Sequence, residues 1–378
     1  MTSSNSTEIK FIIFAPRGLK TGGPEGMHQL AWAINTFGYE AKLLAWPKTR
    51  KKLPVNEYQK YRPEWCRVSA INKRDIFIIS ESTQFLPFWY FFFISKNRIY
   101  MWMHSVDFSL DKSFNQYEKN NYVLNSEWQD RKKRESNIKN IARTIGLLRV
   151  YWDFKSFFSL IKKIFFKLKI EIPSSNYIFA SYYSQNIVTK VKHSRSDILL
   201  SGWVNGMETE NLQDLDFCSC SKSHVAFNPG KSKEPIKRIL DINAARNMTL
   251  HFVPITGIRT DREVYKLLSS CDLYLDLGFF PGLERTPREA IKMDCPVLLA
   301  KRGAARFYED FPLPNLYLLN LELLDTAGTY DSILKILSIG KQNNLNNQKE
   351  FKNHISKEKS TFLKEVSRFI NLIKQLEK

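Results

Sequence analysis

Cysteine is scarce in this sequence, and the spacing of the few cysteines suits neither a zinc site nor a disulfide framework. The five residues are Cys66, Cys218, Cys220, Cys271 and Cys295. A secretory signal is also lacking, because the first residues carry no basic segment followed by an apolar one. The most apolar run, residues 85–94, is shorter than the ~20 residues that a membrane-spanning helix needs. We therefore expect reduced thiols and a cytoplasmic protein that does not cross a membrane.

Acidic residues are in deficit, and this sets the net charge. The 38 Asp and Glu residues are outnumbered by 57 Lys and Arg, which gives +19 at pH 7. Such an excess predicts an anionic partner: nucleic acid, a phosphate-bearing substrate or acidic lipid. The rest of the composition is ordinary, with 43% hydrophobic and 25% charged residues, and it excludes long disorder and a collagen-like chain. A length of 378 residues predicts two domains.

More than half of the excess charge lies in residues 131–170. Twelve basic residues stand there against Glu135 and Asp153, so the segment carries +10 of the +19. Residues 152–170 interleave aromatic side chains with lysines, a pattern typical of a helix that lies on an acidic membrane surface. The same pattern describes an amphipathic helix packed on its own domain with a solvated basic face. A nucleic-acid partner is not expected, because no recognisable nucleic-acid-binding motif accompanies the charge.

Strands and helices alternate along the first half of the chain. The apolar run 9–16 predicts a strand, followed by a glycine-bearing loop at 17–26 and a helix over 27–37. Further strands are expected at 40–46, 75–80, 98–105, 177–181 and 197–204, with a helix after residue 181. We interpret the phenylalanine-rich run 85–94 as a buried crossover helix. This alternation predicts parallel βαβ units with helices on both faces of a sheet.

A second alternating series follows a polar stretch. Strands are predicted at 224–227, 250–257, 272–278 and 296–303, and helices at 234–246, 261–271 and 286–294. We therefore expect an α/β protein with two Rossmann-like domains that face a cleft. The first domain spans 1–209 with a basic amphipathic insertion at 131–170, and a linker follows at 210–223. The second domain spans 224–345, and a C-terminal helix spans 346–378.

The loops after the second series of strands carry candidate binding residues. In open parallel sheets, ligands bind beyond the carboxyl ends of the strands, where helix N-termini and loop amides hold phosphate. Five cations that suit a diphosphate are expected to converge there. They are Lys231, Arg285, Arg288, Lys301 and Arg302. The other candidates in these loops are Asn228, Gly230, Ile255, Thr256, Pro281, Gly282 and Glu284.

The segment from Thr286 to Glu289 supports two interpretations. As local structure it is a capping box, in which Thr286 caps a helix, Pro287 takes its first position and Glu289 reaches back to the cap amide. As a binding site, it has Glu289 accepting hydrogen bonds from a ribose diol while Arg285 and Arg288 face phosphate. The sequence alone leaves both open.

The two Rossmann-like halves, the loop from Gly22 to Glu25 and the stretch from Pro281 to Ala290 before a predicted strand resemble the GT-B glycosyltransferases over nearly the whole chain. More narrowly, four segments in order resemble a group of bacterial polysaccharide-locus glycosyltransferases. They are GGPEGMHQL, MWMHSVDF, ASYYSQNI and PGLERTPREA. This resemblance implies transfer of a sugar from a nucleotide-sugar, held mainly by the second domain, to a glycan or lipid-linked acceptor, held mainly by the first. It also implies an enzyme that needs no metal and no cofactor besides the nucleotide-sugar.

The glutamate pattern of this family matches only in part. The common retaining pattern has two glutamates separated by seven residues, and Glu289 matches the second of them. Pro281 stands where the first would fall, and Glu284 lies three residues further on. The stereochemical outcome of transfer therefore stays open.

Catalytic candidates in the first domain follow from the need to remove a proton from an acceptor hydroxyl, which takes a carboxylate or imidazole in the cleft. They are His104 and Asp107, at the end of a predicted strand, and Glu25. We interpret His28 as a helix-face residue. Gly22 and Gly23 are expected to let backbone amides approach the donor phosphate.

We thus expect a glycosyltransferase of cell-surface polysaccharide synthesis, at the inner face of the plasma membrane if residues 131–170 bind lipid. Two other functions share the pattern. One is a GT-B-like nucleotide-sugar epimerase, which would convert the donor without an acceptor. The other is a non-catalytic basic protein that binds membrane or nucleic acid on a degenerate transferase fold.

Overall fold

The first half of the chain folds into a six-stranded parallel sheet. The computed structural model describes residues 9–18, 20–45, 55–81, 98–106, 113–114, 116–117, 173–205, 223–230, 233–247, 250–256 and 260–377. The strands are β1 (Lys10–Ala15), β2 (Glu40–Ala45), β3 (Trp65–Cys66), β4 (Ile76–Ser80), β5 (Ile99–Met103) and β6 (Tyr177–Phe179). Their order, β3-β2-β1-β4-β5-β6, is that of a Rossmann sheet, in which the order of strand addition reverses between β1 and β4.

Apolar side chains alternate between the two faces of this sheet. Phe11 and Ile13 pack on one face against helix α1 (Gly22–Thr36), whereas Ile12 and Phe14 pack on the other. A strand covered on both faces needs apolar residues at successive positions, which is why β1 reads as a continuous apolar run. Helix α6 (Tyr182–Lys192) follows β6 and begins with a capping box at Ser181.

The second half forms a five-stranded parallel sheet in the order β11-β10-β9-β7-β8. Its strands are β7 (Ser223–Phe227), β8 (Leu250–Pro254), β9 (Leu273–Asp276), β10 (Val297–Ala300) and β11 (Leu318–Leu319). The helices are α7 (Lys233–Ala245), α8 (Asp261–Ser270), α9 (Arg285–Lys292), α10 (Thr326–Ile339) and α11 (Lys341–Asn347). This is again a doubly wound sheet, and its order reverses between β7 and β9. The two sheets confirm the predicted fold class.

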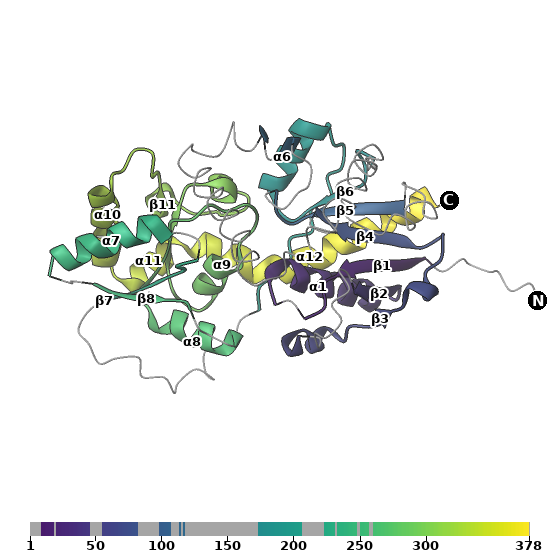
Figure 1. Cartoon of the computed structure of the whole chain (residues 1–378), viewed down its shortest axis with the longest axis horizontal. Helices are drawn as coiled ribbons and strands as arrows, with labels where there is room; N and C mark the ends of the chain where they lie inside the picture. The colour runs from purple at the N-terminus through teal and green to yellow at the C-terminus, as the bar shows by residue number, and fades with distance from the viewer. Residues whose placement is uncertain are drawn as a thin grey trace, which may run out of the picture.

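Helix α12 (Lys349–Leu376) joins the two halves at the end of the chain. In Figure 1 it runs in yellow from the second half, beside α9 and α11, along the first half to the C-terminus. Phe351 and Ile355 are buried with the second sheet, whereas Phe369 and Ile373 are buried with α1 and β1. One long amphipathic helix therefore buries side chains in both cores.

Several local expectations differ from the structure. Helix α1 begins at Gly22 rather than at residue 27, because Pro24 needs no amide partner in a first turn and Glu25 complements the helix dipole there. Residues 197–204 form a single bridge, Phe179 to Leu199, instead of a strand. The short helix η1 (Asn56–Tyr61) and strand β3 were not expected. None of the helices among the described ranges is long and apolar enough to cross a membrane.

Some predictions fall outside the described residues. They are the crossover helix at 85–94, the basic insertion at 131–170 and most of the linker at 210–223. Of the predicted site residues, Asp107 and Lys231 also lie outside.

Candidate active site

A cavity of about 530 Å³ lies where the two halves meet. Its walls come from the carboxyl ends of β1, β4 and β5, the start of α1, and the segment from residue 281 into α9. The lining residues are Pro16, Thr21 to Met27, Gln29, Ser80, Glu81, His104, Ser105, Ala180, Gly202, Trp203, Pro281 to Arg285 and Arg288. The carboxyl ends of parallel strands are the expected place for a ligand, so this cavity is the candidate site.

Two helix N-termini from opposite halves line this cavity. Helix α1 starts after Thr21 and helix α9 after Glu284, and in neither case does the capping side chain bond to the helix amides. The first amides of a helix lack intrahelical partners and carry partial positive charge. The cavity can therefore bind an anion between the two helices.

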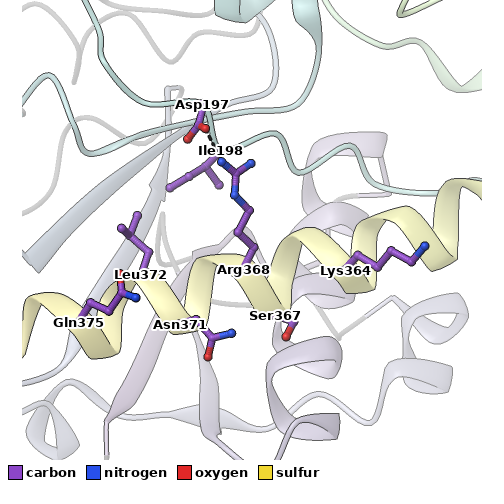
Figure 2. A pocket seen from close by; sticks show the side chains of 8 residues that line it. All are labelled: Asp197, Ile198, Lys364, Ser367, Arg368, Asn371, Leu372 and Gln375. Atoms are coloured by element: carbon purple, nitrogen blue, oxygen red, sulfur yellow. Dashed lines mark hydrogen bonds and ion pairs between the residues drawn. The ribbon is translucent and has the colours of Figure 1, made fainter.

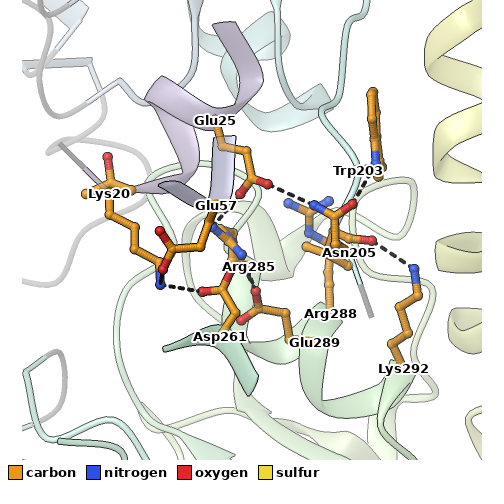
Figure 3. Close-up of polar contacts among 12 residues, drawn as sticks. Lys20, Glu25, Glu57, Trp203, Asn205, Asp261, Arg285, Arg288, Glu289 and Lys292 are labelled. Atoms are coloured by element: carbon orange, nitrogen blue, oxygen red, sulfur yellow. Dashed lines mark hydrogen bonds and ion pairs between the residues drawn. The ribbon is translucent and has the colours of Figure 1, made fainter. Parts of the chain in front are cut away.

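Arg285, at the start of α9, is held between two carboxylates from opposite halves of the protein (Figure 3). Its Nη1 lies 2.5 Å from Oε2 of Glu25, while Nε and Nη2 donate to Oε1 of Glu289 at 3.0 and 2.6 Å. Burial opposes the charge on Arg285, but Glu289 and Glu25 together raise its pKa above the usual value. Arg285 is thus a fixed positive charge at the cavity wall.

Glu25 is buried, with 3% of its surface exposed, and has partners besides Arg285. Its Oε1 accepts hydrogen bonds from the hydroxyl of Tyr61 and from Nδ2 of Asn205, each at 2.8 Å, and lies 3.5 Å from Nζ of Lys60. Lys60 and Tyr61 belong to η1, and Asn205 lies in the segment after α6. These three residues are far from Glu25 in the sequence, which is why the sequence alone does not predict their contacts with it.

A second ion pair joins the two halves beside the first. Lys20, just before α1, lies 2.9 Å from Asp261 at the start of α8 and 2.6 Å from Glu57 (Figure 3). The polarity is opposite to that of the first pair, because here the first half supplies the cation. The two pairs hold the start of α1 against α8 and α9.

Arg288 points into the protein. Its Nη1 donates to Oε1 of Glu358 in α12 at 2.8 Å and to the carbonyl of Gly202 at 2.7 Å, and its Nε donates to the carbonyl of Glu284 at 3.0 Å. Both members of the ion pair are almost fully buried. The guanidinium of Arg288 therefore ties α9, α12 and the segment at residue 202 together, a contact that sequence reasoning missed.

The predicted capping box at the start of α9 is wrong. The N-cap residue is Glu284 rather than Thr286, and Glu289 bonds to Arg285 instead of reaching back to the cap amide. An arginine four residues before a glutamate on a helix offers it a charged partner, which here replaces the neutral backbone amide. Burial raises the pKa of the Glu289 carboxyl.

His104 lies at the inner end of the cavity, after β5. Its ring packs on Trp102 with centroids 4.2 Å apart, and burial lowers its pKa to about 3, so the imidazole is neutral at pH 7. Its Nε2 has no hydrogen-bond partner among the described residues. Its amide donates to Oε2 of Glu81 at 3.0 Å, and burial raises the pKa of Glu81 to about 7.

His28 is part of the core of the first half. Its ring lies 4.8 Å from that of Tyr58 and 5.7 Å from that of Trp65, and burial lowers its pKa to about 4. It does not line the cavity.

Two glycines allow the halves to approach closely. A side chain on Gly282 would place its Cβ 2.1 Å from the carbonyl oxygen of His104. A side chain on Gly22 would meet the aliphatic stem of Arg285 at 3.2 Å. Both contacts cross between the halves, so these glycines set how near the cavity walls come.

The other predicted residues are distributed as follows. Gly22, Gly23, Pro281, Gly282, Glu284 and Arg285 line the cavity. Four other predicted residues follow β7 and β8 but do not line the cavity: Asn228, Gly230, Ile255 and Thr256. Oδ1 of Asn228 accepts a hydrogen bond from the amide of Gly230 at 3.0 Å. Lys301 does not line the cavity, and its Nζ donates to Oδ1 of Asn315 at 3.3 Å. Within the described ranges, no cluster of three or more His, Cys, Asp or Glu side chains could hold a metal ion.

A second hollow, of about 450 Å³, lies between α12 and residues 197–198 (Figure 2). Polar side chains of α12 form most of its wall, and Arg368 is paired there with Asp197. None of the predicted site residues lines it.

The architecture is similar to that of several solved structures, although no sequence match was found. No family model matches the sequence, and no curated protein matches it. Among solved structures, a glycosyltransferase from Rickettsia africae is similar with a TM-score of 0.59 at 13% identity, over 98% of this chain and 99% of that one. Sucrose-phosphate synthase from Thermosynechococcus elongatus gives 0.59 at 11% identity, over 97% and 99%. A structure from E. coli named trehalose-6-phosphate, bound with UDP-2-fluoro glucose, gives 0.54 at 10% identity, over 97% and 99%.

The fold is therefore that of the GT-B glycosyltransferases, in which two Rossmann-like units face one another. Similarity at these identities extends over nearly the whole chain and shows its fold alone.

Proposed function

We propose that the protein is a glycosyltransferase that moves a sugar from a nucleotide-sugar to an acceptor. The observation that carries this proposal is the meeting of two uncapped helix N-termini, α1 and α9, at one cavity between two Rossmann-like units. Such an arrangement suits a diphosphate, because amides of both helices can donate to it. The UDP-sugar bound to the structural neighbour from E. coli gives further support.

We assign the donor to the second half and the acceptor to the first. In this assignment Arg285 faces the diphosphate, and Glu289 accepts hydrogen bonds from the ribose diol. His104 faces the acceptor hydroxyl. Because its imidazole is neutral, Nε2 can accept a hydrogen bond that this hydroxyl donates. We also propose that transfer needs no metal, because the helix amides and Arg285 supply positive charge at the diphosphate.

The acceptor is proposed to be a glycan or lipid-linked sugar of cell-surface polysaccharide synthesis. This proposal rests on the four sequence segments that resemble polysaccharide-locus enzymes. The basic segment 131–170 is proposed to bring the protein to an acidic membrane surface.

Thermal unfolding in the presence of UDP-, GDP-, ADP- and CDP-sugars tests the donor site. A ligand present at about 100 times its Kd stabilises by about 2.7 kcal/mol, so we expect one class of donor to raise the Tm of a chain of this length by about 3 °C. If no donor moves the Tm of the folded protein, the proposal is wrong.

Product analysis with the bound donor alone then separates two reactions. A transferase hydrolyses the donor slowly and releases a nucleoside diphosphate. Conversion of the donor into its sugar epimer would instead identify an epimerase. EDTA treatment is expected to leave turnover unchanged, and loss of turnover that Mn²⁺ restores would contradict metal independence.

A further inference from the structure

Each guanidinium nitrogen of Arg285 already has a carboxylate partner. Nε and Nη2 donate to Glu289, and Nη1 lies 2.5 Å from Glu25. Two of the five N–H groups take no part in these contacts, but the two carboxylates already neutralise the charge of Arg285. A phosphate that forms a close ion pair with Arg285 therefore competes with one of the two carboxylates.

The structure distinguishes the two carboxylates. Glu289 is four residues from Arg285 on the same helix, so the pair moves as one unit. Glu25 belongs to the opposite half, and it keeps Tyr61, Asn205 and Lys60 as partners when the contact with Arg285 is broken. Because those partners all bond through Oε1, the atom that leaves Arg285 is Oε2 alone. Releasing Glu25 therefore costs less than releasing Glu289.

We propose that Glu25 occupies the anion position on Arg285 while the donor is absent, and that the donor diphosphate takes this position on binding. This inference rests on the proposed function and adds an exchange of anions to it. Once released, Oε2 of Glu25 faces the cavity and becomes available to an acceptor hydroxyl. Donor binding thus precedes the formation of a complete acceptor site.

The position of Gly22 supports an exchange at this point. The aliphatic stem of Arg285 lies beside Gly22, at the uncapped start of α1. An anion that replaces Oε2 at Arg285 is therefore next to the first amides of α1 as well as those of α9. A single carboxylate oxygen bonds to Arg285 alone, whereas a diphosphate offers oxygens to all three groups.

Isothermal titration calorimetry with UDP, GDP, ADP and CDP tests the exchange. Glu25→Gln keeps an oxygen for Tyr61 and Asn205 but removes the charge that competes for Arg285. We expect this variant to bind the preferred nucleoside diphosphate about tenfold more tightly than wild type, which corresponds to about 1.4 kcal/mol. In the background of Arg285→Gln, the same substitution is expected to give no gain.

Asp261→Asn is the matched control. It removes the other ion pair between the halves, with Lys20, and leaves the contact between Glu25 and Arg285 intact. We expect its affinity to equal that of wild type. An equal gain in Asp261→Asn would show that loosening the halves, and not exchange at Arg285, raises affinity, and it would overturn the inference.

The remaining outcomes separate this inference from the proposed function. If wild type binds a nucleoside diphosphate and Glu25→Gln binds it equally or more weakly, the exchange is wrong and the donor site stands. If neither protein binds any of the four, the proposed function fails and the exchange with it. Circular dichroism checks that each variant is folded. If Glu25→Gln does not fold, Glu25→Asp replaces it. The aspartate side chain is one methylene shorter and no longer reaches Arg285, so we expect this variant also to bind the nucleoside diphosphate more tightly than wild type.

Discussion

We expect Glu358→Leu to destabilise the protein strongly, although Glu358 lies in α12, outside both sheets. The substitution leaves the charge of Arg288 buried without its carboxylate, which costs about 3–5 kcal/mol for pairs of this kind. It also removes the acceptor of the Val204 amide, which donates to Oε2 of Glu358 at 3.0 Å, at about 1–3 kcal/mol. Because Arg288 retains the carbonyls of Gly202 and Glu284, the two losses do not add fully. The expected loss in the free energy of unfolding is about 4 kcal/mol.

Urea unfolding measures this loss, followed by both circular dichroism and tryptophan fluorescence, since a two-state free energy requires that the two transitions coincide. The double variant Arg288→Met/Glu358→Leu is expected to recover most of the stability, because it buries no unpaired charge. A loss below about 1 kcal/mol in Glu358→Leu would refute the reasoning.

Three further predictions concern other contacts of the first half. Burial lowers the pKa of His28 to about 4, below the 6.5 of an unfolded histidine, so the contribution of His28 to stability falls as pH falls from about 6.5 to about 4. In urea unfolding at pH 8 and pH 5, wild type should therefore lose about 2 kcal/mol more than His28→Leu between the two pH values, and equal losses would contradict this role. Gly282→Ala should force the halves apart at the carbonyl of His104 and weaken nucleotide binding at least about tenfold, and unchanged affinity would show that the close contact is not needed. Asp310, in the second half, accepts hydrogen bonds from the first two amides of α6, in the first half, at 2.8 and 2.9 Å. Asp310→Ala should lower the free energy of unfolding by about 1–2 kcal/mol, and an unaltered Tm would contradict that role.

The sequence predicted the architecture because each buried strand carries its own apolar signal. The run that contains β1 is apolar at successive positions, and the same holds for β4 and β10. Doubly wound sheets then follow from the alternation of strands and helices. The start of α1 was placed too late, because glycines and a proline in the first turn are typical of loops as well.

The site could be predicted only in part, since its contacts join residues far apart in the chain. Of the residues that the sequence singled out, Arg285, Gly22 and Gly282 line the cavity, whereas Glu289 contacts it only through Arg285. Nothing in the sequence indicated that Glu25 would meet Arg285, or that Glu358 would hold Arg288 inside the protein, because neither pair has a local pattern. Pairing across two domains depends on their final packing, which periodicity does not encode.

The central claim is that the cavity between the two halves binds the diphosphate of a nucleotide-sugar. Calorimetric titration of wild type and Arg285→Gln with UDP, GDP, ADP and CDP tests it most directly. We predict that one of these ligands binds wild type with one site per chain and binds Arg285→Gln at least about tenfold more weakly. Absence of binding to the folded protein, or binding that Arg285→Gln leaves unchanged, would contradict the claim.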